Sequence, residues 1–252
     1  MSTNPKLVGE YQSPDENAAG LISEMLNALR YDGHVLDPDE VSGIVASFIP
    51  RGARVLDVGC GTGSLSRIVA DVCHADVVGI EADPRRAARA GARGLTVRVG
   101  YFSHELIREL GSFDVVLFAD VLEHLPNPQA MLLLARECLK SRGSVIVSVP
   151  NVAHWSVRVD LVRGRFLYQP CGIMDATHLR WFTAAAVRSL LASSGFNVTG
   201  YRATAGLTLA DNVDRRPWRW LPINSRTRIL RFTCRRWPTL FGTQHVLKAE
   251  MV

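Results

Sequence analysis

The chain has 252 residues, of which 47% are hydrophobic and 21% are charged, so it can bury a sizeable core and is neither disordered nor fibrous. Its five cysteines are widely spaced and form no Cys-x-x-Cys pair, which excludes an obvious disulfide framework or zinc knuckle and suits a reducing compartment. The N-terminus lacks the layout of a signal peptide, and no apolar run is long enough to span a membrane. We therefore expect a cytoplasmic protein.

The net charge of +5 is concentrated in one late segment. Residues 213–237 contain eight arginines against one aspartate, so the rest of the chain is slightly acidic. This distribution argues against nucleic-acid binding by the whole protein. Three interpretations of residues 215–237 stay open: a solvated cover, a lid over an anionic acceptor, or a short helix lying on an anionic membrane surface.

The first 50 residues are expected to form a tail and covering helices. Helical spacing of apolar residues occurs over 17–30, and Asp37-Pro38 is expected to open a second helix that runs to about residue 48. These helices either cover an edge of the sheet or also close over a bound ligand. Residues 51–252 are predicted to form one domain.

Residues 51–150 alternate between apolar strands and stretches of helical spacing. Because runs such as Val115–Phe118 suit strands that are buried on both faces, we predict an α/β fold with a Rossmann-like, doubly wound parallel sheet. The predicted strands are 54–58, 76–80, 96–99, 114–118 and 144–149, and the predicted helices lie near 64–73, 84–91, 104–110 and 128–140.

The alternation stops after the fifth strand. The insert at 150–183 should lie at the carboxyl edge of the sheet, where ligands of open α/β folds bind. A helix beginning at Thr183 and strands at 197–201 and 245–251 are expected to follow. The Arg/Trp-rich segment at 207–240 reads as irregular.

The stretch VLDVGCGTG at residues 55–63 is an apolar strand that runs into three glycines at alternate positions. Such a turn, followed by a helix, suits a backbone that lies against a cofactor. The dinucleotide fingerprint would place a third glycine where Ser64 stands, and the carboxylate of Asp57 would repel a pyrophosphate but could receive an ammonium group. Glu81, at the tip of the second strand, can accept hydrogen bonds from both hydroxyls of a ribose. These residues favour a cofactor with a cationic amino-acid end, and a dehydrogenase is a less favoured alternative.

Four collinear motifs within residues 50–151, VLDVGCGTG, VVGIEAD, FDVVLFADVLEHLPNP and GSVIVSVPN, resemble the class I S-adenosylmethionine-dependent methyltransferases. The resemblance implies a seven-stranded sheet whose last strand is antiparallel, with S-adenosylmethionine as cofactor and S-adenosylhomocysteine as product. The loop at 100–103 departs from the usual Gly-Asp, so its aromatic residues are the weaker candidates. The cofactor-binding residues implied are Asp57, Gly59, Cys60, Gly61, Gly63, Glu81, Ala82, Tyr101, Phe102, Ser103, Asp120 and Val121.

Methyl transfer to a hydroxyl requires an aligned nucleophile, exclusion of water and a base. We predict His178 as the base, with Asp175 or Glu123 fixing its tautomer. The alternative is a polar loop that only fixes the following helix. The candidate catalytic residues are His178, Glu123, His124 and Asp175, and the candidate substrate-binding residues are His154, Trp155 and Arg180.

A metal is the weaker alternative for activating the acceptor. Asp120, His124, Asp175 and His178 could converge on Mg²⁺, but no metal-ligand spacing is present in the sequence. We therefore expect a metal-free site.

Shorter motifs bear on the acceptor. PNVAHW at 150–155 resembles a subgroup of O-methyltransferases and the W-type proteins of methionine biosynthesis, and LEHLP at 122–126 is shared with ubiquinone-type O-methyltransferases. DATHLRWFT at 175–183 and LFGTQHV at 240–246 resemble methyltransferases of sugar and cell-surface glycan assembly. We predict an O-methyltransferase acting on a small molecule, preferably a sugar or glycan of polysaccharide biosynthesis. The alternatives are a quinone or phenolic acceptor, or a non-catalytic S-adenosylmethionine-binding regulatory protein.

Overall fold

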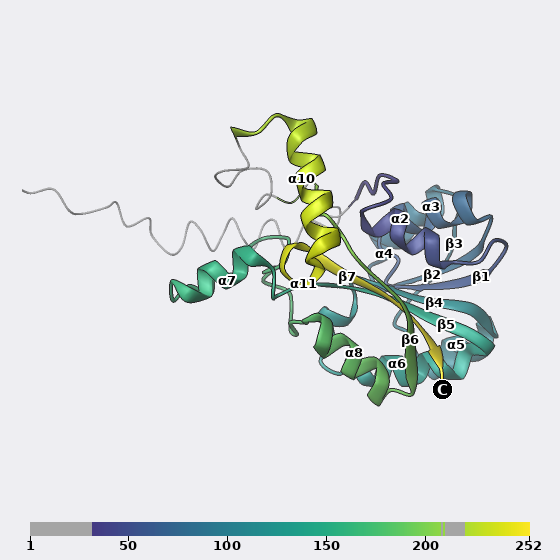
Figure 1. Ribbon diagram of the computed structural model, residues 1–252. Coiled ribbons are helices and arrows are strands. Elements are labelled where there is room, and N and C mark those ends of the chain that lie inside the picture. The colour runs from purple at the N-terminus through teal and green to yellow at the C-terminus, as the bar shows by residue number, and fades with distance from the viewer. Residues whose placement is uncertain (1–31, 208, 210–219) are drawn as a thin grey trace, which may run out of the picture.

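The computed structural model describes residues 32–207, 209 and 220–252, and these form a seven-stranded sheet with helices on both faces (Figure 1). The strand order is β3-β2-β1-β4-β5-β7-β6. The first five strands pair in parallel, whereas β7 runs antiparallel to both β5 and β6. The predicted Rossmann-like sheet with an antiparallel last strand is therefore confirmed. The strands are β1 (Arg54–Val58), β2 (Asp76–Glu81), β3 (Thr96–Val99), β4 (Phe113–Ala119), β5 (Leu139–Pro150), β6 (Phe196–Ala203) and β7 (Gln244–Met251).

The helices between the strands begin at capping residues that the sequence displays. Asp83 and Asn127 each accept a hydrogen bond from a backbone amide of the first turn, and a proline follows each of them. Thr183 caps the helix after the insert in the same way, as predicted. The helices are α3 (Ser64–Cys73), α4 (Pro84–Ala92), α5 (His104–Leu110), α6 (Pro128–Cys138) and α8 (Ala184–Ser193), with a 3-10 turn, η1 (Leu122–His124), after β4.

Side chains of the central strands alternate between two apolar layers. Val115 and Leu117 pack with α3 and with α2 (Val41–Phe48), whereas Val116 and Phe118 pack with α5, α6 and α8. The two groups of helices lie on opposite faces of the sheet (Figure 1). The strands are thus buried on both faces, as their apolar runs predict.

The N-terminal prediction was correct only in part. The helix expected over 17–30 lies outside the described residues. The second helix begins at Val41 and not at Asp37-Pro38, because residues 37–40 form a turn in which the amide of Glu40 donates to the carbonyl of Asp37 (3.1 Å). The helix covers a face of the sheet next to α3, and its last residue, Phe48, also lies against Gly200 on the edge strand β6.

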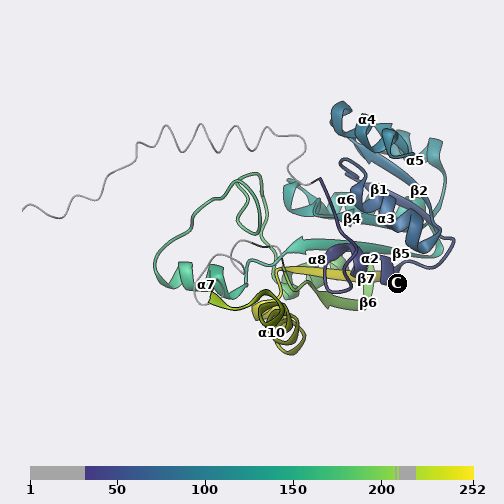
Figure 2. The same cartoon turned by 90° about the horizontal axis from the view of Figure 1, so that it is seen from above.

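Two helices lie apart from these layers. In the insert, α7 (Trp155–Val162) projects from the sheet, on the side away from α4 and α5 (Figure 2). The expectation of an irregular segment at 207–240 was wrong for its second half, which forms α10 (Ile223–Arg236) and α11 (Pro238–Phe241). Residues 210–219 lie outside the described part.

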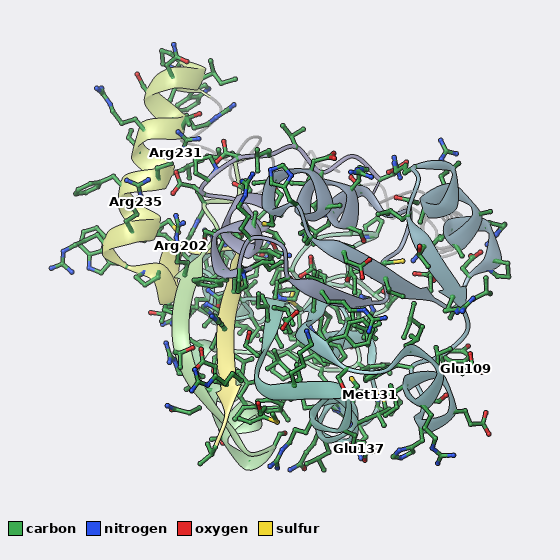
Figure 3. All side chains as sticks on the ribbon, turned by 90° about the vertical axis from the view of Figure 1, so that its right-hand side faces the viewer. Glu109, Met131, Glu137, Arg202, Arg231 and Arg235 are labelled. Carbon is green, nitrogen blue, oxygen red and sulfur yellow. The ribbon has the colours of Figure 1, made fainter. Side chains whose placement is uncertain are left out.

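Helix α10 is attached to the domain by ion pairs with the N-terminal turn. Arg231 reaches the carboxylate of Asp37 at 2.7 Å, and Arg235 reaches that of Asp39 at 2.9 Å (Figure 3). Arg202 on β6 approaches the same Asp39 at 3.2 Å, so several arginines compensate a carboxylate that is only 4% exposed. None of the helices in the described residues is long and apolar enough to cross a membrane.

Candidate functional site

The glycine turn links β1 to α3 at the carboxyl edge of the sheet. All three of its glycines have positive φ angles, and the amides of Gly59 and Cys60 both donate to the carbonyl of Ile80 on β2 (2.8 and 3.0 Å). A Cβ at Gly63 would lie 2.5 Å from Leu95, whereas a Cβ at Gly61 would meet nothing within 4 Å. The turn is therefore packed against the protein at Gly63 and open at Gly61, as expected of a surface that receives a ligand.

Two carboxylates lie beneath and beside this turn. One Glu81 oxygen accepts from the amide of Gly61 and the other from the amide of Asp83, each at 2.8 Å. Each of these oxygens has a second lone pair that can receive a hydroxyl. Asp57 is buried and accepts from the hydroxyl of Ser66 at 2.5 Å. Burial raises the pKa of Asp57 to about 7, partly opposed by that hydrogen bond, and the nearby charge of Glu81 raises it further.

The residues expected around an adenine differ in their environment. Ala82 is exposed beside Glu81, and Tyr101 is 83% exposed. Phe102 instead packs edge-on against Phe118 in the core (6.0 Å), and the hydroxyl of Ser103 caps α5. A cofactor contact from Phe102 would therefore have to come from its backbone, whereas the Ser103 hydroxyl, which accepts from Leu106 in the cap, still has its own O–H to donate.

Asp120 follows β4 in a left-handed conformation, with a φ of 54°, which is uncommon for a residue other than glycine. One carboxylate oxygen accepts from the hydroxyl of Ser148 on β5 and from the amide side chain of Gln244 on β7, each at 2.8 Å. The next residue, Val121, faces Gly59, where an added Cβ would meet its methyl group at 2.8 Å. The end of β4 thus lies directly against the glycine turn.

The predicted catalytic residues Glu123, His124 and His178 come together beside this point. One ligand atom from each lies within 4.8 Å of the other two, and the two imidazole rings are in edge contact with centroids 4.9 Å apart. Backbone pairing between η1 and the insert holds them there, because the amides of Leu179 and Arg180 both donate to the carbonyl of Glu123 (2.8 and 3.0 Å). The structure therefore joins two segments that lie more than 50 residues apart in the chain.

Glu123 and His178 are held in an unusual electrostatic environment. Glu123 is 1% exposed, and within the described residues neither of its carboxylate oxygens has a hydrogen-bond partner. Burial raises its pKa well above the ordinary range, and the charge of Asp120 raises it further. Burial, followed by the proximity of His124, lowers the pKa of His178, so its imidazole is neutral at pH 7.

Asp175 acts on the loop rather than on His178 in the contacts that are resolved. It is fully buried and accepts from both the amide and the hydroxyl of Thr177 (2.8 and 2.6 Å). His178 instead has its Nδ1 3.1 Å from the carbonyl of Ile173. The resolved partner of Nδ1 is therefore the carbonyl of Ile173. It is not the carboxylate of Asp175 or Glu123, which we predicted from the sequence.

The predicted substrate-binding residues are dispersed. His154 is fully buried at the start of α7, with its Nδ1 2.9 Å from the hydroxyl of Ser156. The indole N–H of Trp155 is buried without a partner among the described residues. Arg180 donates to the carbonyl of Pro126 at 2.7 Å and so connects the insert to the segment after η1.

Some residues near the site were missed from the sequence. Thr62 donates to Asp32 at 2.8 Å, and the amide of His34 donates to Ser64 at 2.7 Å, so residues 32–34 lie against the start of α3. In the sequence, the only indication of a role for residues 32–34 was their position shortly before the second predicted helix. Gln244, which bonds to Asp120, stood in the LFGTQHV motif without an assigned role.

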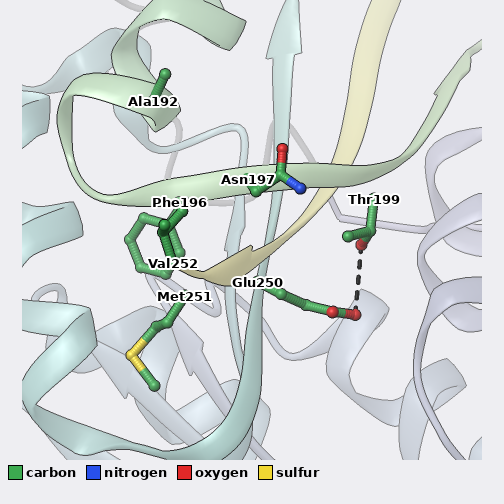
Figure 4. Close-up of a pocket in the computed structure, with 7 residues that line it drawn as sticks. All are labelled: Ala192, Phe196, Asn197, Thr199, Glu250, Met251 and Val252. Atoms are coloured by element: carbon green, nitrogen blue, oxygen red, sulfur yellow. Dashed lines mark hydrogen bonds between the residues drawn. The ribbon is translucent and has the colours of Figure 1, made fainter.

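Two of the hollows in the described surface bear on where an acceptor could lie. One, of about 140 Å³, lies between α7 and residues 165–174 and is lined by apolar side chains such as Phe166, Leu167 and Met174 together with polar ones such as Asp160 and Arg165. The other, of about 470 Å³, lies between the start of β6 and the end of β7, where Thr199 bonds to Glu250 (Figure 4). Because β6 begins at the amino edge of the parallel strands, the larger hollow lies at the opposite edge from the glycine turn. We therefore associate only the smaller one with the site.

Comparisons with known proteins agree with this architecture. Residues 21–200 match the family described as methyltransferase domain. The chain is 33% identical over 161 residues to the ubiquinone biosynthesis O-methyltransferase of Xanthomonas axonopodis pv. citri, covering 60% of this chain and 66% of that protein. It is 42% identical over 106 residues to the protein of the same name from Cereibacter sphaeroides, covering 40% of this chain and 42% of that protein. The chain thus spans just under two thirds, or less, of the length of these relatives.

Solved structures show the same fold at lower sequence identity. An S-adenosylmethionine-dependent methyltransferase from Archaeoglobus fulgidus superposes with a TM-score of 0.55 at 17% identity, covering 83% of this chain and 94% of that one. The 1,6-didemethyltoxoflavin-N1-methyltransferase of Burkholderia thailandensis, solved with S-adenosylhomocysteine, gives 0.54 at 18% identity, covering 100% and 98%. With the sheet order, the glycine turn and a family match over most of its length, the chain belongs to the methyltransferase domain family, as a class I S-adenosylmethionine-dependent methyltransferase.

Proposed function

We propose that the protein transfers the methyl group of S-adenosylmethionine to a hydroxyl of a small-molecule acceptor held beneath the 150–183 insert. The acceptor oxygen attacks the methyl carbon, the carbon–sulfur bond breaks with its electron pair going to sulfur, and the hydroxyl proton is released. The observation that supports this best is the Glu123, His124 and His178 cluster beside the end of β4. Glu123 and His178 are buried and His124 is half-buried, and together they could activate a hydroxyl next to the turn that we assign to the methyl donor.

In this proposal the cofactor lies along the glycine turn. Glu81 accepts from the ribose hydroxyls, Ala82 and Tyr101 lie beside the adenine, and Gly61 lets the backbone approach the methionine moiety. The charge of Asp57 and Asp120 favours the cationic amino-acid end. The free lone pairs of Glu81 and the open space at Gly61 support this orientation.

Without a metal, His178 is the proposed base. Its Nδ1 can donate to the carbonyl of Ile173, which leaves the lone pair of Nε2 to accept a proton. The lowered pKa keeps that nitrogen unprotonated at pH 7, although it also makes the imidazole a weaker base.

A phenolic ring is the acceptor class we favour. The relatives named above are ubiquinone biosynthesis O-methyltransferases, and none of the named comparisons concerns a sugar. Phe166, Tyr168 and Trp181 form an aromatic group with ring centroids 5.6 to 6.1 Å apart, next to the smaller hollow. Such rings can stack on a planar acceptor. A sugar hydroxyl is the second candidate, supported by the DATHLRWFT motif.

A cytoplasmic location stays part of the proposal, since all five cysteines are free thiols.

The test is formation of S-adenosylhomocysteine by the purified chain with three acceptor sets: catechols and other phenols, sugar nucleotides, and primary amines. We expect turnover with phenols and a loss of at least 100-fold in kcat/KM for His178→Ala. His104→Ala, at an exposed histidine on α5, is the matched control and should retain full turnover. Turnover with amines alone would contradict the proposal. Binding of S-adenosylmethionine with no turnover in any set would favour the regulatory alternative.

A further inference from the structure

We propose that Glu123, His124 and His178 bind a divalent transition-metal cation of the Mn²⁺, Co²⁺ and Zn²⁺ class. One ligand atom from each residue lies within 4.8 Å of the other two. Ligand atoms about 2.1 Å from an ion are roughly 3 to 3.5 Å from one another. Side-chain rotations that move each atom by about 1 Å would therefore bring all three within coordination distance of one ion. The backbone bonds between Glu123 and residues 179–180 already hold the two segments together.

The carboxylate of Glu123, to which no group of the described residues donates, supports a bound cation. It is 1% exposed, and within the described residues nothing donates a hydrogen bond to either oxygen. A buried carboxylate without a donor is costly, and native structures compensate such groups with a hydrogen bond, an ion pair or a metal. Two imidazoles at this distance supply the other ligands of a metal.

Both histidines are oriented as metal ligands usually are. Nδ1 of His178 lies 3.1 Å from the carbonyl of Ile173, and Nδ1 of His124 lies 3.2 Å from the carbonyl of Thr177. In each case donation from Nδ1 to a backbone carbonyl leaves Nε2 with a free lone pair. Asp175 holds Thr177 through two hydrogen bonds, so it orients His124 without contacting the ion.

The set of ligands selects the class of metal. Two imidazoles and one carboxylate suit Mn²⁺, Co²⁺ or Zn²⁺, whereas Mg²⁺ and Ca²⁺ prefer oxygen ligands alone. The set also differs from the Mg²⁺ site considered from the sequence. Both sets contain His124 and His178, but the structure groups them with Glu123 and not with Asp120 and Asp175. Three protein ligands leave positions open for an acceptor hydroxyl, whose pKa the ion would lower. This consequence rests on the proposed function, but binding of the ion does not.

The test is a titration of the untagged chain, stripped with EDTA and dialysed, with Co²⁺ followed by absorbance and with Zn²⁺ and Mg²⁺ followed by calorimetry. We expect one Co²⁺ or Zn²⁺ per chain and at least 100-fold weaker binding of Mg²⁺. Glu123→Gln and His178→Asn should each weaken Co²⁺ binding at least 10-fold while S-adenosylhomocysteine still binds, which verifies that the variants are folded. The exposed pair His104 and Glu137, 3.0 Å apart, supplies the matched controls His104→Asn and Glu137→Gln, which should bind Co²⁺ as the unaltered chain does.

Absence of Co²⁺ and Zn²⁺ binding in a chain that still binds S-adenosylhomocysteine would overturn the metal site. Equal binding by Glu123→Gln and the unaltered chain would overturn its assignment to these residues, and equal affinity for Mg²⁺ would overturn the class of metal. Full turnover of a phenol after EDTA would leave the proposed function intact and remove the metal from it. One bound Co²⁺ without turnover of any acceptor would leave the site intact and remove the function.

Discussion

At the residue scale, two glycines of the same turn differ in what surrounds them. A Cβ at Gly63 would collide with Leu95, whereas a Cβ at Gly61 would project into open space. Both residues have a positive φ, so substitution strains the backbone at either position. Only at Gly61 does the added atom point to where we place the cofactor. A substitution at Gly61 should therefore weaken cofactor binding as well as stability, whereas the same substitution at a similar glycine away from the site should lower stability alone.

We expect Gly61→Ala to bind S-adenosylhomocysteine at least 10-fold more weakly than the unaltered chain, while backbone strain lowers its stability by about 1 kcal/mol. The control is Gly94→Ala, because Gly94 has a φ of 77° and open space at its Cβ but lies in the loop between α4 and β3. It should lose similar stability and keep its affinity. Calorimetry and thermal unfolding measure the two quantities. Equal affinities for the two variants would show that Gly61 does not face the cofactor.

At the element scale, α10 has an inner face that is bound to the domain and an outer face that is exposed. Leu230 and Cys234 are buried, and Arg231 and Arg235 pair with aspartates of the N-terminal turn. Arg228, Phe232 and Arg236 recur every four residues and are exposed. The interpretation as a loosely packed cover therefore fails for the inner face, while the membrane and lid interpretations now concern the outer face alone.

We expect the double variant Arg228→Gln and Arg236→Gln to lose most of any binding to vesicles that contain anionic lipid, because each cation near such a surface contributes about 1 kcal/mol. Cosedimentation at low and moderate salt measures the binding. A matched control removes the exposed Arg108 and Arg142, on α5 and β5, by the same substitution. Equal sedimentation of the two double variants, or no binding by the unaltered chain, would eliminate the membrane proposal.

At the scale of the whole molecule, the buried Asp57 and the half-buried Glu40 make stability depend on pH. Burial raises the pKa of Glu40 to about 7, although its carboxylate accepts from the amide of Leu207 at 2.8 Å. Burial raises the pKa of Asp57 to about 7 as well. The folded state therefore holds protons that the unfolded chain releases near pH 4 to 4.5. The stabilisation is fully present below that range and is lost as the pH rises through about 7.

We expect the contribution of Glu40 to the free energy of unfolding to fall between pH 5 and pH 8, so that Glu40→Gln loses less stability than the unaltered chain over this range, by an amount on the order of 1 kcal/mol. The glutamine keeps the oxygen that accepts from Leu207 but has no charge to bury. Denaturant titrations at several pH values measure the effect, and Glu105→Gln, at an exposed residue of α5, is the control. A slope in Glu40→Gln equal to that of the control would contradict the raised pKa of Glu40.

Most elements of the fold could be predicted because their signals are local. The apolar runs of β1 and β4, the caps at Asp83 and Asn127, and the glycine turn each depend on neighbours within a few residues. Helix α10 gave no such signal, since it buries only Leu230 and Cys234 and its arginines pair with residues more than 190 positions earlier. Its helical state is stabilised by contacts that periodicity does not contain.

The sequence by itself predicted the sheet, because strand runs are local properties of the chain, and it predicted the methyl donor through the resemblance of its four motifs to class I S-adenosylmethionine-dependent methyltransferases. It named Glu123, His124 and His178 as candidates, with His178 as the base, and its expectation of a site without metal stays a prediction. Only the tertiary structure decided that these three side chains meet, that Glu123 has no donor among the described residues, and that the carbonyls of Ile173 and Thr177 orient the histidines. The physical reason is that their convergence depends on pairing between η1 and the insert, segments that lie more than 50 residues apart.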